Sequence, residues 1–287
     1  MLKIILITGI SGSGKTIALR MLEDIGFICI DNFPIKFLND FIDYAKDNNL
    51  TKIAISIDSR SIGELQHLPI FIQKIKTYIR NIKIIFLDAK DDIIIKRYTE
   101  SRRRHPLTDK IKNNFPAPLE ICINAERKLL SDLRNQEYII DTSNLTPGQL
   151  RNYIKSLVNI EDINKLVLTF ESFAYKNGIP NDADLVFDVR CLPNPYYNMD
   201  LRELNGKDKS VEIWLEKFDI VNNMLNDITY FLSNWLPKYI QETKNYLTVA
   251  IGCTGGQHRS VYIVEKLAII FSQYKPLLIR HRAQEKI

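Results

Sequence analysis

The sequence predicts an α/β protein, with a doubly wound parallel sheet followed by a second α/β domain. In the first half, short apolar runs of strand type alternate with segments of helical periodicity, which is the pattern of βαβ units. In two places such a run leads through a glycine-rich loop into a helical pattern, at Gly9–Thr16 and at Cys253–Ser260. Each loop would present backbone N–H groups at a helix N-terminus, where anions bind.

Length and composition indicate two globular domains. The chain has 287 residues, 45% of them hydrophobic and 25% charged, and we expect domains at residues 1–158 and 159–287 with a polar linker at 159–164. No apolar run could span a bilayer and the first strand begins at once, so a cytoplasmic protein without membrane contact is expected. The four cysteines form no CxxC pair, which gives no support to a zinc site or to disulfides. The net charge of +5 is a mild bias toward anionic partners.

The first loop carries the motif G-x-x-x-x-G-K-T, the phosphate-binding loop of P-loop NTPases. The apolar run Ile4–Ile7 precedes it and a helical pattern follows, as the motif requires. Its backbone N–H groups would surround the phosphates of ATP or GTP, Lys15 would reach the outer phosphates, and the Thr16 hydroxyl would bind Mg²⁺. The expected nucleotide contacts here are Gly9, Ile10, Ser11, Gly12, Ser13, Gly14, Lys15 and Thr16.

Four aspartates follow the expected strands of the first half: Asp31, Asp58, Asp88 and Asp141. Ligands of doubly wound sheets bind at the carboxyl ends of the strands. One of these carboxylates should therefore help to hold Mg²⁺, as the acid of a Walker B strand does. Asp58 and Asp88 both follow apolar runs of strand type and are both candidates.

A basic segment, Lys96–Leu107, extends a helical pattern up to a proline. If the segment is a lid, its arginines would stabilise the negative charge of the phosphoryl group during its transfer. Arg103 is the candidate catalytic residue among them. As a nucleic-acid patch it would contact backbone phosphates, and as a plain helix face it would be solvated. Its position after the Asp88 strand favours the lid.

The second half begins with strand-type runs at 165–173 and 183–190, the second of which ends in Asp188 and Arg190. Residues 219–240 carry apolar side chains at helical spacing, which indicates a core-facing helix. The same stripe would suit a subunit interface.

The loop Cys253–Ser260 is the second candidate anion site. It also has the Cys-x5-Arg spacing of cysteine-dependent phosphatases, whose loop amides and arginine hold a phosphate next to a thiolate. Such catalysis would need a general acid, for which Asp184 and Asp188 are candidates. The expected contacts of this site are Asp188, Arg190, Cys253, Thr254, Gly255, Gly256, His258, Arg259 and Ser260.

The C-terminal stretch 274–287 is basic. Arg280, Arg282 and Lys286 would either contact RNA phosphates or lie at a solvated chain end.

Taken together, these stretches resemble the RapZ/YvcJ family of bacterial P-loop nucleotide-binding proteins nearly from end to end. Three motifs in the second half have little precedent elsewhere and make the resemblance specific. They are Phe170–Pro180, Asp188–Pro195 and Cys253–Val261; the first half adds Gly9–Thr16, Asp31–Pro34, Asp58–Arg60, Arg102–Leu107 and Asp141–Ser143.

The resemblance implies weak ATPase and GTPase activity, with Asp58, Ser59, Arg60 and Ser61 as the family's guanine-nucleotide segment. It also implies that the second domain senses a phosphorylated amino sugar, glucosamine-6-phosphate. In enterobacterial relatives the protein binds small RNAs and presents one to an endonuclease. Those relatives end in a strongly basic tail, whereas this chain ends in Gln284–Ile287.

Three functions follow as hypotheses. The first is a regulatory NTPase, a homo-oligomer that binds ATP or GTP with Mg²⁺ in one domain and the sugar phosphate in the other. The second is an RNA-binding adapter whose nucleotide site only sets conformation. The third is a small-molecule kinase with Asp31 as the base that activates an acceptor hydroxyl.

Overall fold

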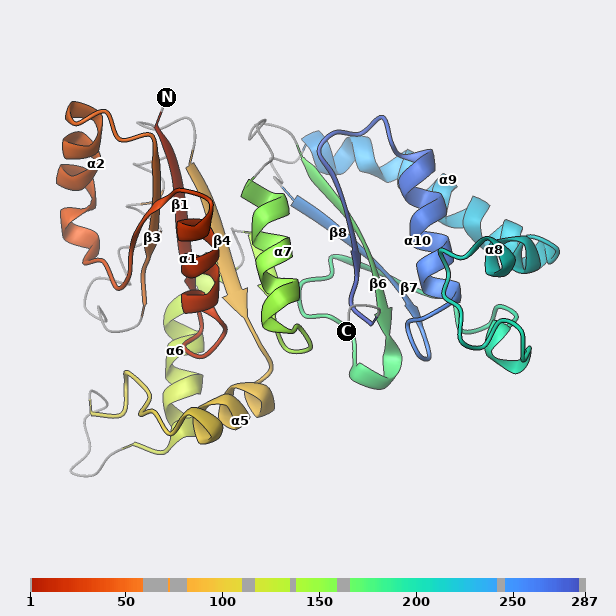
Figure 1. Cartoon of the computed structure of the whole chain (residues 1–287), viewed down its shortest axis with the longest axis horizontal. Helices are drawn as coiled ribbons and strands as arrows, with labels where there is room; N and C mark the ends of the chain where they lie inside the picture. Colours follow the sequence, from red (N-terminus) through yellow and green to blue (C-terminus); the bar gives the residue numbers. More distant parts are fainter. Residues whose placement is uncertain are drawn as a thin grey trace. The chain divides into compact units, whose positions relative to one another are not determined.

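The computed structural model describes residues 2–58, 72, 82–109, 117–134, 138–158, 166–241 and 246–283. The chain divides into two compact units, Met1–Glu161 and Asp162–Ile287. The expected boundary after residue 158 and the expected linker stay predictions, since 159–165 lie outside the described residues. Each unit is built on its own parallel sheet (Figure 1).

The sheet of the first unit has five parallel strands in the order β2-β3-β1-β4-β5. Because parallel neighbours need crossover connections, helices lie between the strands. The strands are β1 (Lys3–Gly9), β2 (Ile28–Ile30), β3 (Lys52–Ser56), β4 (Ile82–Asp88) and β5 (Tyr138–Asp141). The described helices are α1 (Lys15–Asp24), the 3₁₀ turn η1 (Ile35–Phe37), α2 (Leu38–Asp47), α5 (Asp91–Ser101), α6 (Leu119–Arg134) and α7 (Pro147–Val158).

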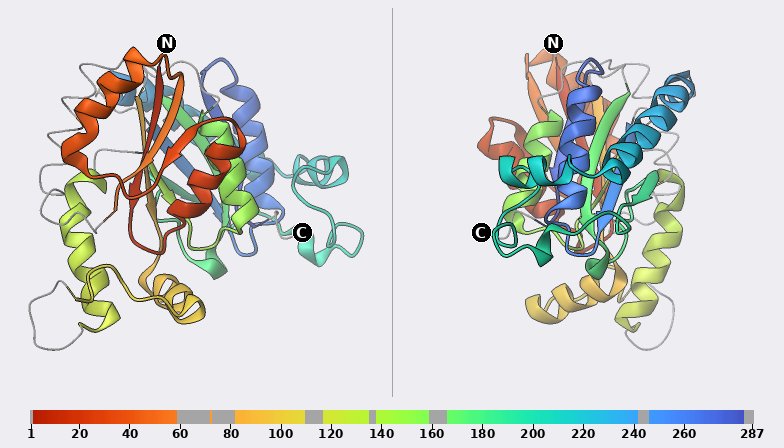
Figure 2. Two further views of the ribbon diagram at one scale, coloured as in Figure 1. Left: turned by 60° about the vertical axis from the view of Figure 1, so that its left-hand side comes forward. Right: turned by 90° about the vertical axis from the view of Figure 1, so that its right-hand side faces the viewer.

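Helices cover both faces of this sheet (Figure 2). Apolar residues of α2 and α6 join the strands in one core, as Ile42 and Leu130 do, while α1 and α7 pack on each other on the opposite face. Burial on both faces explains the continuous apolar runs of β1 and β4. The doubly wound parallel sheet predicted from the sequence is confirmed.

The second unit contains a four-stranded parallel sheet in the order β7-β8-β6-β9. Its strands are β6 (Val167–Ala174), β7 (Leu185–Asp188), β8 (Tyr246–Cys253) and β9 (Leu277–His281). Its helices are η3 (Tyr175–Asn177), η4 (Pro195–Tyr197), α8 (Lys209–Leu215), α9 (Asp219–Gln241) and α10 (Arg259–Ile270). Helices α8, α9 and α10 pack with the sheet in one core, which confirms a second α/β domain and the core-facing stripe of 219–240.

Both glycine-rich loops lie at the carboxyl end of a central strand. The first connects β1 to α1, and the second connects β8 to α10. β1 lies between β3 and β4, and β8 lies between β7 and β6. At such positions the loop, the helix N-terminus and the ends of neighbouring strands face one crevice, which is where ligands of open α/β sheets bind.

Candidate functional site

The loop from Gly9 to Thr16 has a backbone shape that requires its glycines. Gly9, Gly12 and Gly14 have φ values of +131°, +89° and +108°, in the region that side chains with a Cβ avoid. A Cβ at Gly9 would lie 2.0 Å from the Leu87 carbonyl oxygen, and one at Gly14 would lie 2.9 Å from a methyl carbon of Leu150. The loop therefore lies tightly against β4 and α7 and leaves its other side open to a ligand.

Side chains around the loop hold its carbonyl oxygens. Arg97 on α5 donates to the Gly12 carbonyl at 3.1 Å and to the Thr142 carbonyl at 2.6 Å, and the Thr142 hydroxyl donates to the Ser13 carbonyl at 2.8 Å. Lys15 donates to the Gly9 carbonyl at 2.6 Å. Burial lowers the pKa of Arg97 from its ordinary value. A loop fixed through its carbonyl oxygens keeps the opposite peptide N–H groups in place for an anion.

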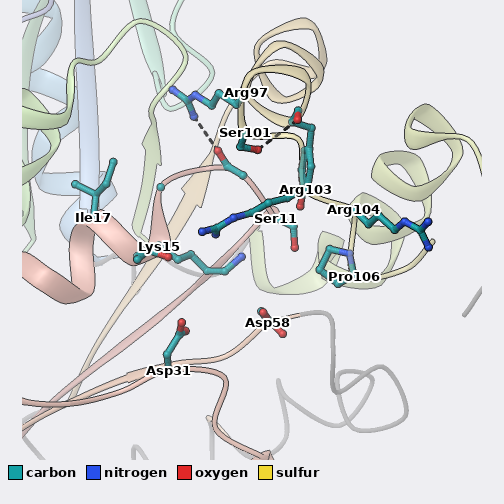
Figure 3. Close-up of a pocket in the computed structure, with 14 residues that line it drawn as sticks. Ser11, Lys15, Ile17, Asp31, Asp58, Arg97, Ser101, Arg103, Arg104 and Pro106 are labelled. Atoms are coloured by element: carbon teal, nitrogen blue, oxygen red, sulfur yellow. Dashed lines mark hydrogen bonds between the residues drawn. The ribbon is translucent and has the colours of Figure 1, made fainter. Parts of the chain in front are cut away.

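A cavity of about 380 Å³ opens in front of this loop (Figure 3). It is lined by the expected residues Ser11, Gly12, Gly14, Lys15, Thr16, Asp58 and Arg103, together with Asp31, Arg97 and Arg104. Figure 3 shows Asp31 and Asp58 on the side of the cavity that faces Lys15, and Arg103 and Arg104 on the segment after α5. Ser59, Arg60 and Ser61, the guanine-nucleotide segment implied by the resemblance, lie outside the described residues.

The structure distinguishes the two aspartates that were both candidates for the magnesium-binding acid. Asp88 is 1% exposed and its carboxylate is held by Arg127 and Arg134, each at 2.9 Å. Asp58 lines the cavity with Lys15 and Thr16. Asp88 thus stabilises the packing of α6 on β4, and Asp58 is the acid in position to face a ligand of the loop.

The donor set fits a nucleotide with its metal. Four basic and two acidic side chains line the cavity, which suits a polyphosphate with a divalent cation. Among the described residues, no group of three or more His, Cys, Asp or Glu side chains gathers to hold a metal.

The second loop faces a separate cavity of about 360 Å³ within the second unit. The expected contacts Cys253, Thr254, Gly255, His258 and Arg259 line it. Gly256 and Ser260 belong to the loop but not to the lining; the Gly256 N–H donates to the Cys253 sulfur at 3.2 Å, and the Ser260 hydroxyl lies 3.1 Å from the same sulfur. Lys176, Asn194, Tyr196 and Tyr197 also line the cavity, although nothing in their sequence pattern predicted a role in this site.

Arg259, the first residue of α10, is the buried cation of this cavity. It is 5% exposed, and it donates to the carbonyl oxygens of Arg190 at 2.7 Å and of Leu192 at 2.9 Å. Its Nε has no hydrogen-bond partner in the described structure. A buried guanidinium N–H without a partner is unfavourable, and an anion in the cavity would satisfy it. Burial also lowers the pKa of His258 from its ordinary value, which favours the neutral imidazole.

Asp188 and Arg190 do not line this cavity. They form an exposed ion pair of 2.6 Å, and the Arg190 guanidinium lies over the Tyr175 ring at 3.9 Å. The pair lowers the pKa of Asp188 and raises that of Arg190. Asp184 accepts the Thr248 N–H at 2.8 Å, and it does not line the cavity beside Cys253 either.

The expectation of a solvated basic chain end is wrong for Arg280 and Arg282. Both belong to β9 or follow it directly and are only 3% and 7% exposed. Arg282 forms ion pairs of 3.1 Å with Glu171 and Asp182, and Arg280 lies 3.5 Å from Asp182. Neither side chain is on the surface to contact RNA; Lys286 lies outside the described residues.

Comparison with known proteins identifies the family. Residues 2–161 match the model of the RapZ-like N-terminal domain, and residues 166–285 match that of the RapZ C-terminal domain. The chain belongs to the RapZ family. The match covers both units, which confirms the resemblance found in the sequence.

Relatives in the RapZ family align along the whole chain. A nucleotide-binding protein of Bordetella petrii is 59% identical and covers 99% of this chain and 98% of its own length. A nucleotide-binding protein of Dechloromonas aromatica is 48% identical and covers 98% of each chain. Among solved structures, a sugar kinase from Janibacter sp. covers 56% of this chain and 96% of its own, at 18% identity and a TM-score of 0.40.

In the described parts, no helix is long and apolar enough to cross a membrane.

Proposed function

We propose that this RapZ family member binds ATP or GTP with Mg²⁺ at Gly9–Thr16 and hydrolyses the γ-phosphate slowly, as part of a regulatory cycle. The observation that carries this proposal is the loop itself: a motif of the P-loop type, fixed against β4 and α7, facing a cavity lined by Lys15, Thr16, Asp58 and Arg103. The name "nucleotide-binding protein" of its relatives supports the same ligand.

Each residue of the cavity has a role that its chemistry suits. The N–H groups of Gly12 and Gly14 and those of the first turn of α1 bind the phosphates, because no carbonyl within a helix satisfies the first N–H groups. The N–H groups of Ile10, Ser11 and Ser13 donate instead to the Leu87 carbonyl, the Glu126 carboxylate and the Ile10 carbonyl. Lys15 leaves the Gly9 carbonyl to contact the outer phosphates. Thr16 and Asp58 would hold Mg²⁺, which would neutralise phosphate charge. Arg103 and Arg104 stabilise the charge that develops on the γ-phosphate as water attacks.

We further propose that the second cavity binds a phosphorylated amino sugar, with glucosamine-6-phosphate as the first candidate. Its phosphate would take the N–H groups at the start of α10 and the Arg259 Nε, the buried donor that lacks a partner. Tyr196, Asn194 and Lys176, which line the same cavity, would contact the sugar. The protein would then respond to two phosphate ligands.

Hydrolysis is tested by phosphate release from ATP and from GTP. We expect Lys15→Ala to abolish turnover, because a cation within reach of the outer phosphates is lost, whereas Lys128→Ala on the exposed side of α6 should leave it unchanged. Near-normal turnover in Lys15→Ala would overturn the assignment of this site.

A kinase is the second candidate, because Asp31 lines the same cavity as Lys15. There it would take the proton of an acceptor hydroxyl as that oxygen attacks the γ-phosphate. The two functions give different products: a regulatory NTPase releases free phosphate only, whereas a kinase forms a phosphorylated acceptor. Mass spectrometry of reactions with candidate small-molecule hydroxyl acceptors distinguishes them, and the kinase hypothesis would also need Asp31→Asn to abolish the transfer.

A further inference from the structure

Glu126, in the middle of α6, is a carboxylate that the proposed function leaves without a role. Its side chain is wholly buried, at 0% exposure. Acidic side chains are almost never fully buried unless they are paired, and a buried charge is tolerated only with hydrogen bonds to it. The residues that hydrogen-bond to Glu126 therefore indicate which parts of the structure it holds in place.

Two of its hydrogen bonds go to one residue of the phosphate-binding loop. One carboxylate oxygen accepts the backbone N–H of Ser11 at 2.8 Å, and the other accepts the Ser11 hydroxyl at 2.7 Å. Together these bonds fix both the peptide and the side chain of Ser11. Hydrogen bonds to a charged acceptor are roughly twice as strong as neutral ones, so Glu126 holds this part of the loop firmly.

A third hydrogen bond connects Glu126 to the basic segment. His105 Nε2 lies 3.2 Å from the carboxylate oxygen that binds the Ser11 N–H. His105 Nδ1 accepts the Leu107 N–H at 3.1 Å, so the ring proton is on Nε2 and the histidine donates to Glu126. The imidazole also packs against Tyr98, with ring centroids 5.4 Å apart.

Both partners of Glu126 belong to walls of the nucleotide cavity. Ser11 lines it from the loop, and Arg104 and Pro106, the residues on either side of His105, line it from the basic segment. Tyr98 also lines the cavity and is close to both partners: its ring packs against His105, and a Cβ on Gly12 would lie 3.1 Å from it. One buried carboxylate thus connects the phosphate-binding loop to the segment that carries the arginines.

We propose that Glu126 is a positioning residue that keeps the phosphate-binding loop and the arginines of the basic segment aligned on the same phosphate groups. This inference rests on the proposed function and adds a residue that itself does not touch the nucleotide. Small misplacements of groups that stabilise a transition state are costly in rate, and such groups need a supporting layer of hydrogen bonds. Loss of Glu126 therefore affects both nucleotide affinity and turnover.

The test compares Glu126→Gln with Glu126→Ala. A glutamine keeps all three contacts, because its oxygen can accept from Ser11 N–H and His105 while its NH₂ donates to the Ser11 hydroxyl. An alanine removes them. We expect Glu126→Gln to stay within about threefold of the wild type in KM and kcat, and Glu126→Ala to raise KM and lower kcat by about tenfold or more each. Wild-type values in Glu126→Ala would overturn the proposal.

A double-mutant cycle separates positioning from a general loss of stability. If Glu126 acts by placing the arginines, Arg103→Ala costs less turnover in the Glu126→Ala background than in the wild type. Additive losses would contradict the proposal. Should Glu126→Ala fail to fold, His105→Phe breaks the bond between Glu126 and the basic segment, together with the Leu107 N–H bond inside that segment, and keeps the bonds between Glu126 and Ser11. The proposal then requires a lower kcat at unchanged nucleotide affinity, and an unchanged kcat would overturn it.

Lys15→Ala, run in the same assay, distinguishes this inference from the proposed function. Full turnover in Lys15→Ala would overturn the proposed function and this inference with it. Loss of turnover in Lys15→Ala, together with wild-type values in Glu126→Ala, would overturn this inference alone.

Discussion

At the scale of the residue, Gly9 decides whether the phosphate-binding loop can form. Its φ is +131°, and a Cβ at this position would approach the Leu87 carbonyl oxygen to 2.0 Å, which leaves no room for a side chain. We expect Gly9→Ala to destabilise the first unit by about 3 kcal/mol, from backbone strain and overpacking. Urea denaturation followed by circular dichroism measures the effect.

Gly148, in the first turn of α7, is the matched control. A Cβ there meets only the Thr146 hydroxyl at 3.9 Å, and its φ is not positive. Gly148→Ala should be neutral or stabilise by up to about 1 kcal/mol, because alanine loses less chain entropy in a helix. Equal stability of the two variants would contradict the account of the loop.

Single residues also show which parts of the structure could be predicted from the sequence and which could not. The spacing of Gly9–Thr16 predicted the loop, since the motif is local. Glu126 gave no signal, because it meets Ser11 across 115 positions of sequence and stands in an ordinary helical pattern. Arg282 looked like part of a polar chain end, yet buried partners at Glu171 and Asp182 place it inside the second unit. Such pairings depend on tertiary packing, which composition does not encode.

At the scale of the element, α7 is anchored by two lysines of the sheet. Lys83 on β4 donates to the Leu157 carbonyl at 2.7 Å, and Lys3 on β1 donates to the Val158 carbonyl. Both carbonyls belong to the last turn of the helix, where cations are favoured. Since Leu150 of α7 packs on Gly14, this anchoring also supports the phosphate-binding loop.

The burial of Lys83 makes stability depend on pH. Burial first, and the neighbouring Lys3 second, lower the pKa of Lys83 from 10.5 to about 8. Between pH 8 and pH 10.5 the Lys83 amine is protonated in the unfolded chain and deprotonated in the folded chain. The free energy of unfolding contributed by Lys83 therefore rises with pH from about 8 to 10.5. The gain is on the order of 2–3 kcal/mol.

Lys83→Met tests this dependence. We expect the variant to lose the rise in unfolding free energy between pH 8 and 10.5, measured by urea denaturation at a series of pH values. Lys128→Met, at an exposed position of α6, should keep the rise. A wild-type pH slope in Lys83→Met would contradict the role of this buried lysine.

At the scale of the whole molecule, each compact unit has a cavity beside one of the two glycine-rich loops. Arg259 tests the second. Charge-assisted hydrogen bonds contribute about 1.5–3 kcal/mol, so Arg259→Ala should weaken glucosamine-6-phosphate binding by about tenfold or more in calorimetry. Lys217→Ala, on the exposed surface of the second unit, should bind normally. Absence of binding by the wild type at millimolar ligand would reject the sugar-phosphate proposal.

The same titrations show whether the two ligands use separate sites. Lys15→Ala should retain glucosamine-6-phosphate binding, and Arg259→Ala should retain nucleotide binding, because each residue lines only one of the two cavities. Loss of both ligands in either variant would contradict the assignment of one ligand to each unit.

Calorimetric titration of the full chain with ATP or GTP in the presence of Mg²⁺ measures whether nucleotide phosphates bind at Gly9–Thr16. We expect saturable binding by the wild type and by Lys128→Ala, with affinity at least about tenfold weaker in Lys15→Ala. Equal affinities of the wild type and Lys15→Ala would contradict this expectation.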